Sequence, residues 1–444
     1  MQAERMGSEE AIQQLPESLQ MLLQWERRHL HKIQSFQKLE YDPGFDVRYF
    51  PQNCGAFPLP CFWIPRRAVV MFGDEDAAPD EFPLSRGCGA TKKMLFPIHP
   101  TSLGHYSQLL SEVGAEDARL SGLLIWAVPT SSTRTLLAWP DGKPELALFF
   151  KTSLHSPIFG DRRLGTRIVA RSVGTSAVLC HARATLPPAF SCFPETTGMI
   201  PRALRDSGAI VRHLPGDLQR GAVFAAPLFA LLGGSGEREP LLLTMLRLAS
   251  MEPLRFLNDI LIAPYAKMWL HLAMKNGVLP EGHGQDFLIG LTPELRPLGK
   301  FFYRDFEGMQ VDWDLRRARR LPAPANLPNA FQWHLTYETW GDPYGQLLSY
   351  KYYFSLAGFS DLVLHEIEES LMEWRAEGLI AVACLQKGLL VRMFSEALRS
   401  SLHDMFDLHL GVGSTFEASR VKFLVALLAL RRRLLSSVRA AAQE

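Results

Sequence analysis

The sequence predicts an α+β protein, with short strands and turns in the first half and mostly helices in the second. Three observations support this prediction. Nine prolines between Asp42 and Leu103 exclude long helices from that stretch. Apolar runs such as GLLIWAV at 122–128 are typical of buried strands. After residue 236, apolar residues recur at helical spacing.

The length and composition are those of an ordinary globular protein. With 444 residues, the chain is long enough for two large domains or three smaller ones, at about 150 residues each. Lys plus Arg is 47 and Asp plus Glu is 46, which gives a net charge of +1. Because there is no overall basic field, we do not expect nucleic acid as a partner, although a few local arginines can still hold a small anion.

The cysteines and the chain start indicate a cytoplasmic protein. None of the six cysteines forms a C-x-x-C pair, which argues against zinc-ribbon and thioredoxin-like sites and favours reduced, buried thiols. The polar start MQAERMGSEEAIQQ does not resemble a signal peptide. The longest apolar runs are far shorter than the ~20 residues that span a bilayer, so no membrane partner is expected.

The first half is expected to begin with a helix at 8–40, where Leu15, Leu19 and Leu22 recur at helical spacing. Short strands and turns fill 42–103, and a helix follows at 105–120. Further strands are expected at 122–128, 146–150 and 167–180. The turn-forming run GGSG at 233–236 is interpreted as a linker, because it lacks the Lys and Ser/Thr of a phosphate loop.

The second half is expected to be mostly helical. Helices are predicted at 240–249, 254–275, 347–357, 360–378, 387–402 and 416–442, and short strands at 286–291 and 299–303. Asn276 and Gly277 form a helix C-cap signal. The basic run RRARR at 316–320 is interpreted as a solvated loop rather than a targeting signal.

Two polar segments of the first half could bind phosphate. The sequence SSTRT, from Ser131 to Thr135, comes directly after the strand at 122–128, and hydroxyls, main-chain amides and an arginine suit a phosphate. Lys151 follows the next predicted strand, and Arg162 and Arg163 come shortly after it. Taken alone, each segment is better explained as an ordinary turn or surface loop, but together they would suit a polyphosphate.

A third polar cluster lies in the second half, in the sequences EGHGQD and YRDFEG. If the first sequence is extended, Glu281, His283 and Gln285 point to one face, and its two glycines let a ligand approach the backbone. Asp305 follows a second short strand that could bring it beside His283. Glu281 and Asp305 are the hard oxygen ligands that Mg²⁺ takes alongside nucleotide phosphates. The alternative interpretation is a polar loop with an ordinary salt bridge.

The order and spacing of these segments resemble the aerobactin-synthetase-like family, the siderophore synthetases that work without a peptide-synthetase template. The family's hallmarks are a Ser-Ser-x-Arg-Thr segment, a Lys with an Arg twelve positions on, an E-A-H-x-Q-N segment and an R-D-x-x-G segment. This chain has SSTRT, Lys151 with Arg163, EGHGQD and RDFEG. The match spans about residues 96 to 308 and includes a His-Pro pair at His99.

The resemblance implies a cupped-hand fold with a reduced thumb at 1–90, β-rich fingers at 91–235 and a largely helical palm at 236–444. It also implies an enzyme that uses ATP and Mg²⁺ to adenylate a carboxylate, usually of citrate. The acyl group then passes to an amine or hydroxyl, with AMP and pyrophosphate released, in siderophore biosynthesis. The expected partners are a polycarboxylate and an amine or hydroxyl substrate, and a homodimer is possible through the apolar C-terminal helices.

The matching positions imply a role for each polar residue. The expected nucleotide contacts are Ser131, Ser132, Arg134, Thr135, Lys151, His283, Gln285 and Asp305. Glu281 and Asp305 would hold Mg²⁺. Lys151, Arg163 and His283 would act in catalysis. The acyl substrate would be held by Arg163, Arg304 and His99, with Arg162 and Arg212 as further cationic candidates.

The chain departs from the family pattern at three points. Gly282 replaces Ala, Asp286 replaces Asn, and no G-H-P-x-H-P-x-x-K-x-R segment precedes His99. Two alternatives to a ligase therefore stay open. One is a kinase-like phosphotransferase, since His283 to Asp286 followed by Arg304 and Asp305 faintly resembles a kinase catalytic loop. The other is a non-catalytic relative that binds only a ligand or a partner subunit.

Overall fold

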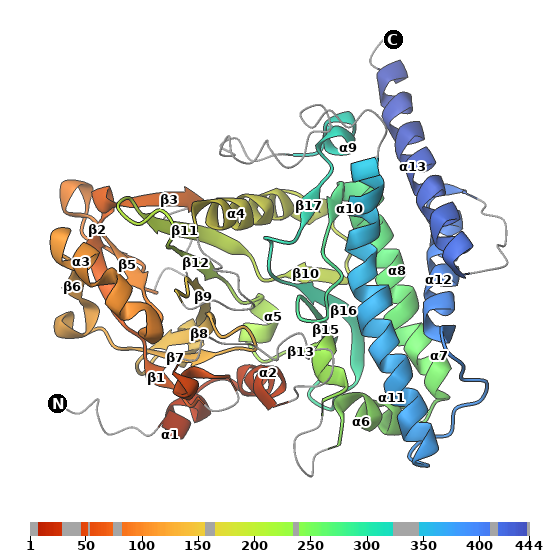
Figure 1. The fold of residues 1–444 in the computed structure, drawn as a ribbon, viewed down its shortest axis with the longest axis horizontal. Coiled ribbons are helices and arrows are strands. Elements are labelled where there is room, and N and C mark those ends of the chain that lie inside the picture. The colour runs from red at the N-terminus through yellow and green to blue at the C-terminus, as the bar shows by residue number, and fades with distance from the viewer. Residues whose placement is uncertain are drawn as a thin grey trace. The chain divides into compact units, whose positions relative to one another are not determined.

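The computed structural model describes residues 8–28, 46–51, 54–73, 82–155, 165–233, 239–322, 346–408 and 416–441 (Figure 1). These residues form two compact units. Unit 1 contains the described residues up to Ala177 together with Phe193–Phe224. Unit 2 contains Val178–Cys192 and the described residues from Ala225 onward. The predicted α+β fold class is confirmed, and the predicted division into thumb, fingers and palm stays a prediction.

Unit 1 is built on two antiparallel sheets. The larger has the strand order β1 (Phe57–Pro58), β7 (Ile125–Pro129), β8 (Thr135–Pro140), β9 (Leu148–Thr152), β12 (Ala209–Arg212), β11 (Glu195–Pro201) and β3 (Val69–Gly73). The smaller has the order β4 (Ser85–Arg86), β5 (Lys93–Pro97), β2 (Cys61–Pro65) and β6 (Glu116–Asp117). Trp63 and Phe96 of the smaller sheet share one apolar core with Leu136 and Phe150 of the larger. This core holds the predicted phosphate-binding segments on rigid strands.

The helices of unit 1 differ from the sequence prediction in several places. They are α1 (Ser8–Gln13), α2 (Glu17–Arg28), α3 (Leu103–Glu112), α4 (Thr166–His181) and α5 (Gly216–Gln219). The predicted helix at 8–40 is two helices separated at Pro16, and residues 29–40 lie outside the described part of the chain. The helix predicted at 105–120 is the shorter α3, since the left-handed Gly114, with φ of 61°, follows its end.

The strand predicted at 167–180 is wrong, because this segment is the helix α4. Its β-branched residues favour a strand locally, but Val169 and Val173, one helical turn apart, pack together against Ile200 and Ile210 of the sheet. Gly198 makes this close packing possible, since a Cβ there would lie 2.4 Å from the Val169 Cγ1. Burial of one helical face therefore overrides the local strand propensity.

Unit 2 combines small sheets with long helices. One sheet has the order β10 (Phe190–Cys192), β16 (Pro297–Tyr303), β15 (Phe287–Leu291) and β13 (Phe224–Pro227), and a second pairs β14 (Val278–Leu279) with β17 (Gln310–Val311). The helices are α6 (Leu241–Ala249), α7 (Pro253–Leu257), α8 (Ala263–Leu270), α9 (Trp313–Ala318), α10 (Gln346–Ala357), α11 (Leu364–Ala376), α12 (Leu389–Phe406) and α13 (Phe416–Ala441). Three π-helical segments extend or join them: Asn258–Ile262, His271–Asn276 and Gly358–Val363.

The predicted helices of unit 2 are confirmed, with π-helical segments inside two of them. Gly277, with φ of 62°, is the predicted left-handed C-cap. The interpretation of 316–320 as a solvated loop is wrong, because the segment begins inside α9. Arg316 there is 1% exposed, and its Nη1 donates to the Asn276 carbonyl at 2.6 Å. A continuous basic run can thus contain a buried arginine.

The cysteines are not mostly buried, in contrast to the sequence prediction. All six are free; Cys54 and Cys61 are buried, whereas Cys88, Cys180 and Cys384 are exposed. Among the described residues, no helix is both long enough and apolar enough to cross a membrane.

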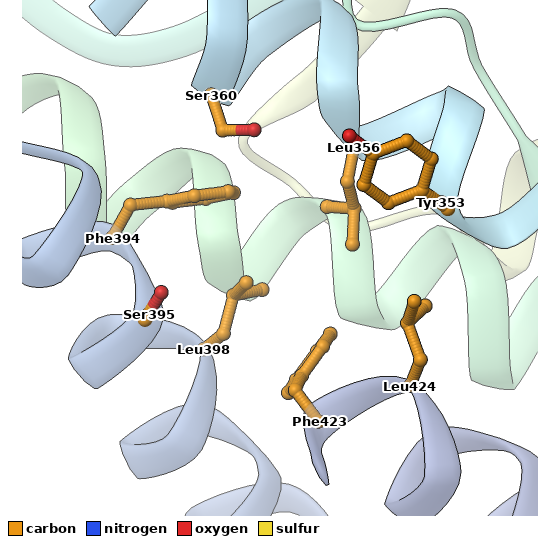
Figure 2. A pocket seen from close by; sticks show the side chains of 8 residues that line it. All are labelled: Tyr353, Leu356, Ser360, Phe394, Ser395, Leu398, Phe423 and Leu424. Carbon is orange, nitrogen blue, oxygen red and sulfur yellow. The ribbon is translucent and has the colours of Figure 1, made fainter. Parts of the chain in front are cut away.

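A mostly apolar pocket lies among the helices of unit 2 (Figure 2). Phe394 and Leu398 of α12 line it together with Phe423 of α13 and Leu356 of α10. None of the sequence-predicted site residues lines this pocket, so the candidate site has to be built from the polar segments themselves.

Candidate functional site

The SSTRT segment is a tight turn that joins β7 to β8 in unit 1. The Thr130 N–H donates to the Thr135 carbonyl at 2.8 Å, and the Thr135 N–H donates to the Ser132 carbonyl at 2.6 Å. Ser131, Arg134 and Thr135 are buried, with at most 4% of their surface exposed, and Ser132 is half-buried. The polar side chains are thus presented from a fixed backbone at the end of two central strands.

The structure brings Lys151 next to this turn. Lys151 lies on β9, directly opposite Thr135 of β8, and directly opposite residues in such a pair have Cβ atoms ~5 Å apart. The Thr152 N–H and hydroxyl both donate to the Arg134 carbonyl, at 2.9 and 3.1 Å. The two segments that the sequence places sixteen or more residues apart therefore form one cluster of hydroxyl and cationic groups in unit 1.

His99 is neutral in this environment and cannot provide a positive charge to a carboxylate. It is 0% exposed, and burial lowers the pKa of His99 to about 3. Its Nδ1 accepts the Thr101 N–H at 3.3 Å and lies 2.7 Å from the Thr101 hydroxyl, so that it caps the short 3₁₀ helix Pro100–Ser102. Any contact that His99 makes with a substrate is a hydrogen bond, with the Nε2 proton as donor.

The other cationic candidates of unit 1 divide into two groups. Arg212, which is 3% exposed, forms an ion pair with Glu195, with its Nε 2.9 Å and its Nη2 2.6 Å from the Glu195 Oε1. Because Glu195 already offsets its charge, Arg212 is a weaker candidate for a substrate anion than the sequence indicated. Arg162 and Arg163 lie outside the described residues, so their predicted roles stay predictions.

In unit 2, the Tyr303 hydroxyl joins the EGHGQD and RDFEG segments. It donates to the Asp305 carbonyl at 3.1 Å and accepts the Glu281 N–H at 3.4 Å. Burial raises the pKa of Tyr303 well above its usual value, and the negative charges of Asp286, Glu281 and Asp305 raise it further. The phenol is therefore a neutral hydrogen-bonding group surrounded by carboxylates, which the sequence analysis did not identify.

Glycines give the Glu281 and His283 segment its shape. A Cβ at Gly308 would lie 2.1 Å from the Glu281 Oε2, so the glycine of RDFEG leaves room for the carboxylate. A Cβ at Gly282 would lie 2.8 Å from the Ser355 carbonyl oxygen and 2.8 Å from the Phe359 nitrogen. The family's alanine therefore does not fit at position 282 of this chain.

His283 begins a turn instead of continuing an extended strand. The Asp286 and Phe287 N–H groups donate to its carbonyl at 3.0 and 3.2 Å, and its Nδ1 accepts the Gln285 N–H at 3.2 Å. This bond places the proton of the neutral ring on Nε2, ready to donate to a ligand. Glu281, His283 and Gln285 are half-buried, and the two glycines between them are buried, but the turn at His283 means that the three side chains do not lie on one face of an extended strand.

Arg304 holds the two segments of unit 2 together. It is 4% exposed, its Nε donates to the Gln285 carbonyl at 2.9 Å, and its N–H donates to the Asp286 carbonyl at 2.9 Å. Arg304 is thus anchored to the backbone beside His283, and its predicted role toward an acyl substrate stays a prediction.

The carboxylates of unit 2 fit a cation that also has phosphate ligands. In the described part of the chain, no three His, Cys, Asp or Glu side chains lie close enough together to hold a metal ion by themselves. Mg²⁺ is usually held by one or two carboxylates together with water and substrate phosphates. Glu281 and Asp305 could provide these two carboxylates, since the negative charges of both lie near enough to raise the pKa of Tyr303.

Glu26 is a contact of the candidate site that sequence reasoning missed. Its Oε2 accepts both the N–H and the hydroxyl of Ser131. A signal was present, because position 26 continues the apolar face formed by Leu15, Leu19 and Leu22. A carboxylate on the buried face of an amphipathic helix needs a polar partner.

Comparisons with known proteins give matches at the level of structure. No protein-family model matches the chain, and no curated protein matches its sequence. The aerobactin synthetase IucC from a hypervirulent pathotype of Klebsiella pneumoniae aligns with a TM-score of 0.58 and 16% identity, over 91% of this chain and 75% of that one.

Two further structures agree with this match. The ATP-bound aerobactin synthetase IucA from a hypervirulent K. pneumoniae pathotype aligns with a TM-score of 0.57 and 16% identity, over 90% of this chain and 74% of that one. The petrobactin biosynthesis protein AsbB from Bacillus anthracis aligns with a TM-score of 0.51 and 17% identity, over 84% and 69%. At these identities, the matches establish a shared fold.

Proposed function

We propose that this chain, which has the fold of the aerobactin-synthetase-like family of siderophore synthetases, is an ATP- and Mg²⁺-dependent ligase. It would adenylate a polycarboxylic acid, citrate or a relative of it, and join the acyl group to an amine or hydroxyl. The product would belong to siderophore biosynthesis, as the family resemblance implies.

The observation that carries the proposal is the cluster of unit 1. Thr135 and Lys151 lie opposite each other on two neighbouring strands of one sheet, and Arg134 directly precedes Thr135 in the turn, in a chain with this fold. Two cations with hydroxyl and amide donors suit a polyphosphate better than a neutral ligand. In unit 2, Glu281 and Asp305 provide the carboxylates that a phosphate-bound Mg²⁺ needs.

Adenylation would require these cations because it brings two anions together. A carboxylate oxygen of the acid attacks the α-phosphorus of ATP, the new P–O bond forms, and pyrophosphate leaves. Lys151, Arg134 and Arg163 would offset the repulsion and the charge that builds on pyrophosphate. Mg²⁺, when bound by Glu281 and Asp305, would supply further charge neutralisation at the phosphates. Removing one such preorganised group typically costs ~10²–10³-fold in rate.

The acyl transfer would follow at the same carboxyl carbon. The neutral amine or the hydroxyl attacks this carbon, AMP leaves, and the nucleophile loses its proton. His283, with its proton on Nε2, would hold a nucleotide oxygen as a hydrogen-bond donor, and Gln285 would contact the nucleotide beside it.

A hydroxylamine-trapping assay with ATP, Mg²⁺ and a panel of di- and tricarboxylates tests the proposal. We expect a hydroxamate with at least one tricarboxylate, together with equal amounts of AMP and pyrophosphate. ADP in place of AMP would indicate the kinase-like alternative. ATP binding without turnover of any acid would indicate the non-catalytic alternative, which the missing upstream motif favours.

A further inference from the structure

Glu26 is a buried carboxylate that already binds the SSTRT turn of unit 1. It is 0% exposed, and its Oε2 accepts the Ser131 N–H at 3.0 Å and the Ser131 hydroxyl at 2.7 Å. Two donors of the turn thus converge on one anionic oxygen. The turn therefore already binds an anion in this structure, and that anion is the Glu26 carboxylate.

The position of Glu26 is fixed by the packing of α2. Near the start of this helix, the Ser18 hydroxyl donates to the Leu218 carbonyl at 2.7 Å. Near its end, the Trp25 ring meets the Phe224 ring edge-on, with the centroids 6.4 Å apart. Since α2 is held at both ends, the carboxylate stays at the turn independently of its bonds to Ser131.

This arrangement opposes the binding of a second anion in two ways. Hydrogen bonds to an ionised carboxylate are roughly twice as strong as neutral ones, so a phosphate must compete with strong bonds for the Ser131 donors. A buried negative charge is also weakly screened, so it repels a phosphate held by Ser132 or Arg134.

We propose that Glu26 is the residue that sets the anion affinity of this turn, holding it below the affinity that the turn would have with a neutral side chain at position 26. The inference rests on the proposed function only in assigning the turn to a phosphate group. It follows that a phosphate at this turn competes with the fixed Glu26 carboxylate for the Ser131 N–H and hydroxyl.

Calorimetric titration of the full chain with inorganic pyrophosphate, and separately with ATP, tests the proposal. Glu26→Gln keeps the shape and one acceptor oxygen but removes the charge. We expect it to bind pyrophosphate roughly fivefold to tenfold more tightly than the wild type, the size expected when charge-assisted bonds become neutral ones.

Glu368→Gln is the matched control. Glu368 is 2% exposed, and it also accepts two hydrogen bonds, from the main-chain N–H groups of Gly388 and Leu390 at the start of α12. The same substitution there removes a buried carboxylate that is not part of the SSTRT turn. We expect its pyrophosphate affinity to equal that of the wild type.

Equal or weaker pyrophosphate binding by Glu26→Gln would overturn the inference and make Glu26 a purely structural residue. Tighter pyrophosphate binding without any ATP binding would uphold the inference and overturn the proposed function. Absence of binding of both ligands to both proteins would overturn both. If Glu26→Gln does not fold, Glu26→Met removes the charge at nearly the same volume, and the same tightening is expected.

Discussion

At the scale of single residues, Asp305 combines a charge with a backbone conformation that few residues adopt. Its φ is +69°, in the left-handed region that favours glycine. Such strain persists where the surrounding structure or function requires the side chain. Since Asp305 is a proposed Mg²⁺ ligand, a substitution that relieves the backbone strain also removes the carboxylate that would bind the metal.

Asp305→Gly should therefore raise stability and strongly reduce turnover. Glycine relieves the left-handed strain, so we expect the free energy of unfolding to rise by up to ~1 kcal/mol. Loss of the carboxylate should reduce adenylation by ~10²–10³-fold. Urea unfolding and pyrophosphate release measure the two effects.

Asp407→Gly is the control for the backbone effect, because Asp407 is also left-handed, with φ of 50°, and ends α12 far along the chain from the polar segments. It should change stability in the same direction and leave turnover unchanged. Normal turnover by Asp305→Gly would remove Asp305 from the metal site.

His99 should make the protein less stable in mild acid. Burial lowers its pKa in the folded protein to about 3, whereas an unfolded histidine has a pKa near 6.5. Between these values the unfolded chain binds the extra proton, so the stabilisation is complete above pH ~6.5 and is lost progressively as the pH falls toward ~3.

Between pH 7 and pH 5, this linkage amounts to about 2 kcal/mol of unfolding free energy. His99→Gln cannot titrate, so the difference between wild type and variant in urea-unfolding free energy should shrink by this amount at pH 5. If the two proteins lose stability in parallel, the imidazole is not held in its neutral form.

At the scale of elements, much of the fold could be predicted, and the failures have identifiable physical causes. Most helices of unit 2 were predictable because apolar residues recur at helical spacing, and Gly277 marks one helix end, whereas α9 was missed because its basic run resembles a solvated loop. The segment at α4 failed because its β-branched residues favour a strand locally, whereas its burial against Ile200 and Ile210 is a tertiary effect.

The packing of α4 gives a test at this scale. A Cβ at Gly198 of β11 would lie 2.4 Å from the Val169 Cγ1 and 3.1 Å from the Val173 Cγ2. We expect Gly198→Ala to lower the free energy of unfolding by roughly 1–3 kcal/mol, as overpacking typically does. Thermal or urea unfolding of the purified protein measures the loss.

A second substitution makes this test specific. Val169→Ala removes the clashing methyl groups, so the double variant should recover part of the stability that Gly198→Ala loses, despite the cavity cost of Val169→Ala alone. Additive losses in the double variant would mean that α4 does not pack on β11 at this point.

In the candidate site too, features of the local sequence could be predicted, whereas tertiary contacts could not. The SSTRT and EGHGQD segments could be recognised from their polar residues and glycines, because such groups are costly unless they have a structural or chemical use. The residues that these segments contact in the folded protein could not be recognised from the sequence. Neither Glu26 at Ser131 nor the Tyr303 hydroxyl between Glu281 and Asp305 follows from spacing along the chain.

At the scale of the whole molecule, the chain contains two compact units, and each combines apolar packing with a buried ion pair, Arg212 with Glu195 in unit 1 and Arg431 with Asp312 in unit 2. The ion pair of unit 2 joins its last helix, α13, to the N-cap of α9. The Arg431 Nε and Nη2 donate to the two Asp312 carboxylate oxygens at 2.5 and 2.9 Å, and the Tyr352 hydroxyl donates to the same carboxylate at 2.9 Å.

Arg431→Leu should therefore weaken unit 2 selectively. Removing one partner of a buried ion pair leaves an uncompensated charge and typically costs ~3–5 kcal/mol. We expect faster hydrogen exchange of the main-chain amides in α9, α10 and α13 than in the wild type, and unchanged exchange in β7, β8 and β9 of unit 1. Arg432→Leu is the matched control, because Arg432 is the exposed neighbour on the same helix and should leave both regions unchanged. Equally accelerated hydrogen exchange in β7–β9 would contradict this prediction, because it would show that the loss of stability spreads through the whole chain and is not confined to unit 2.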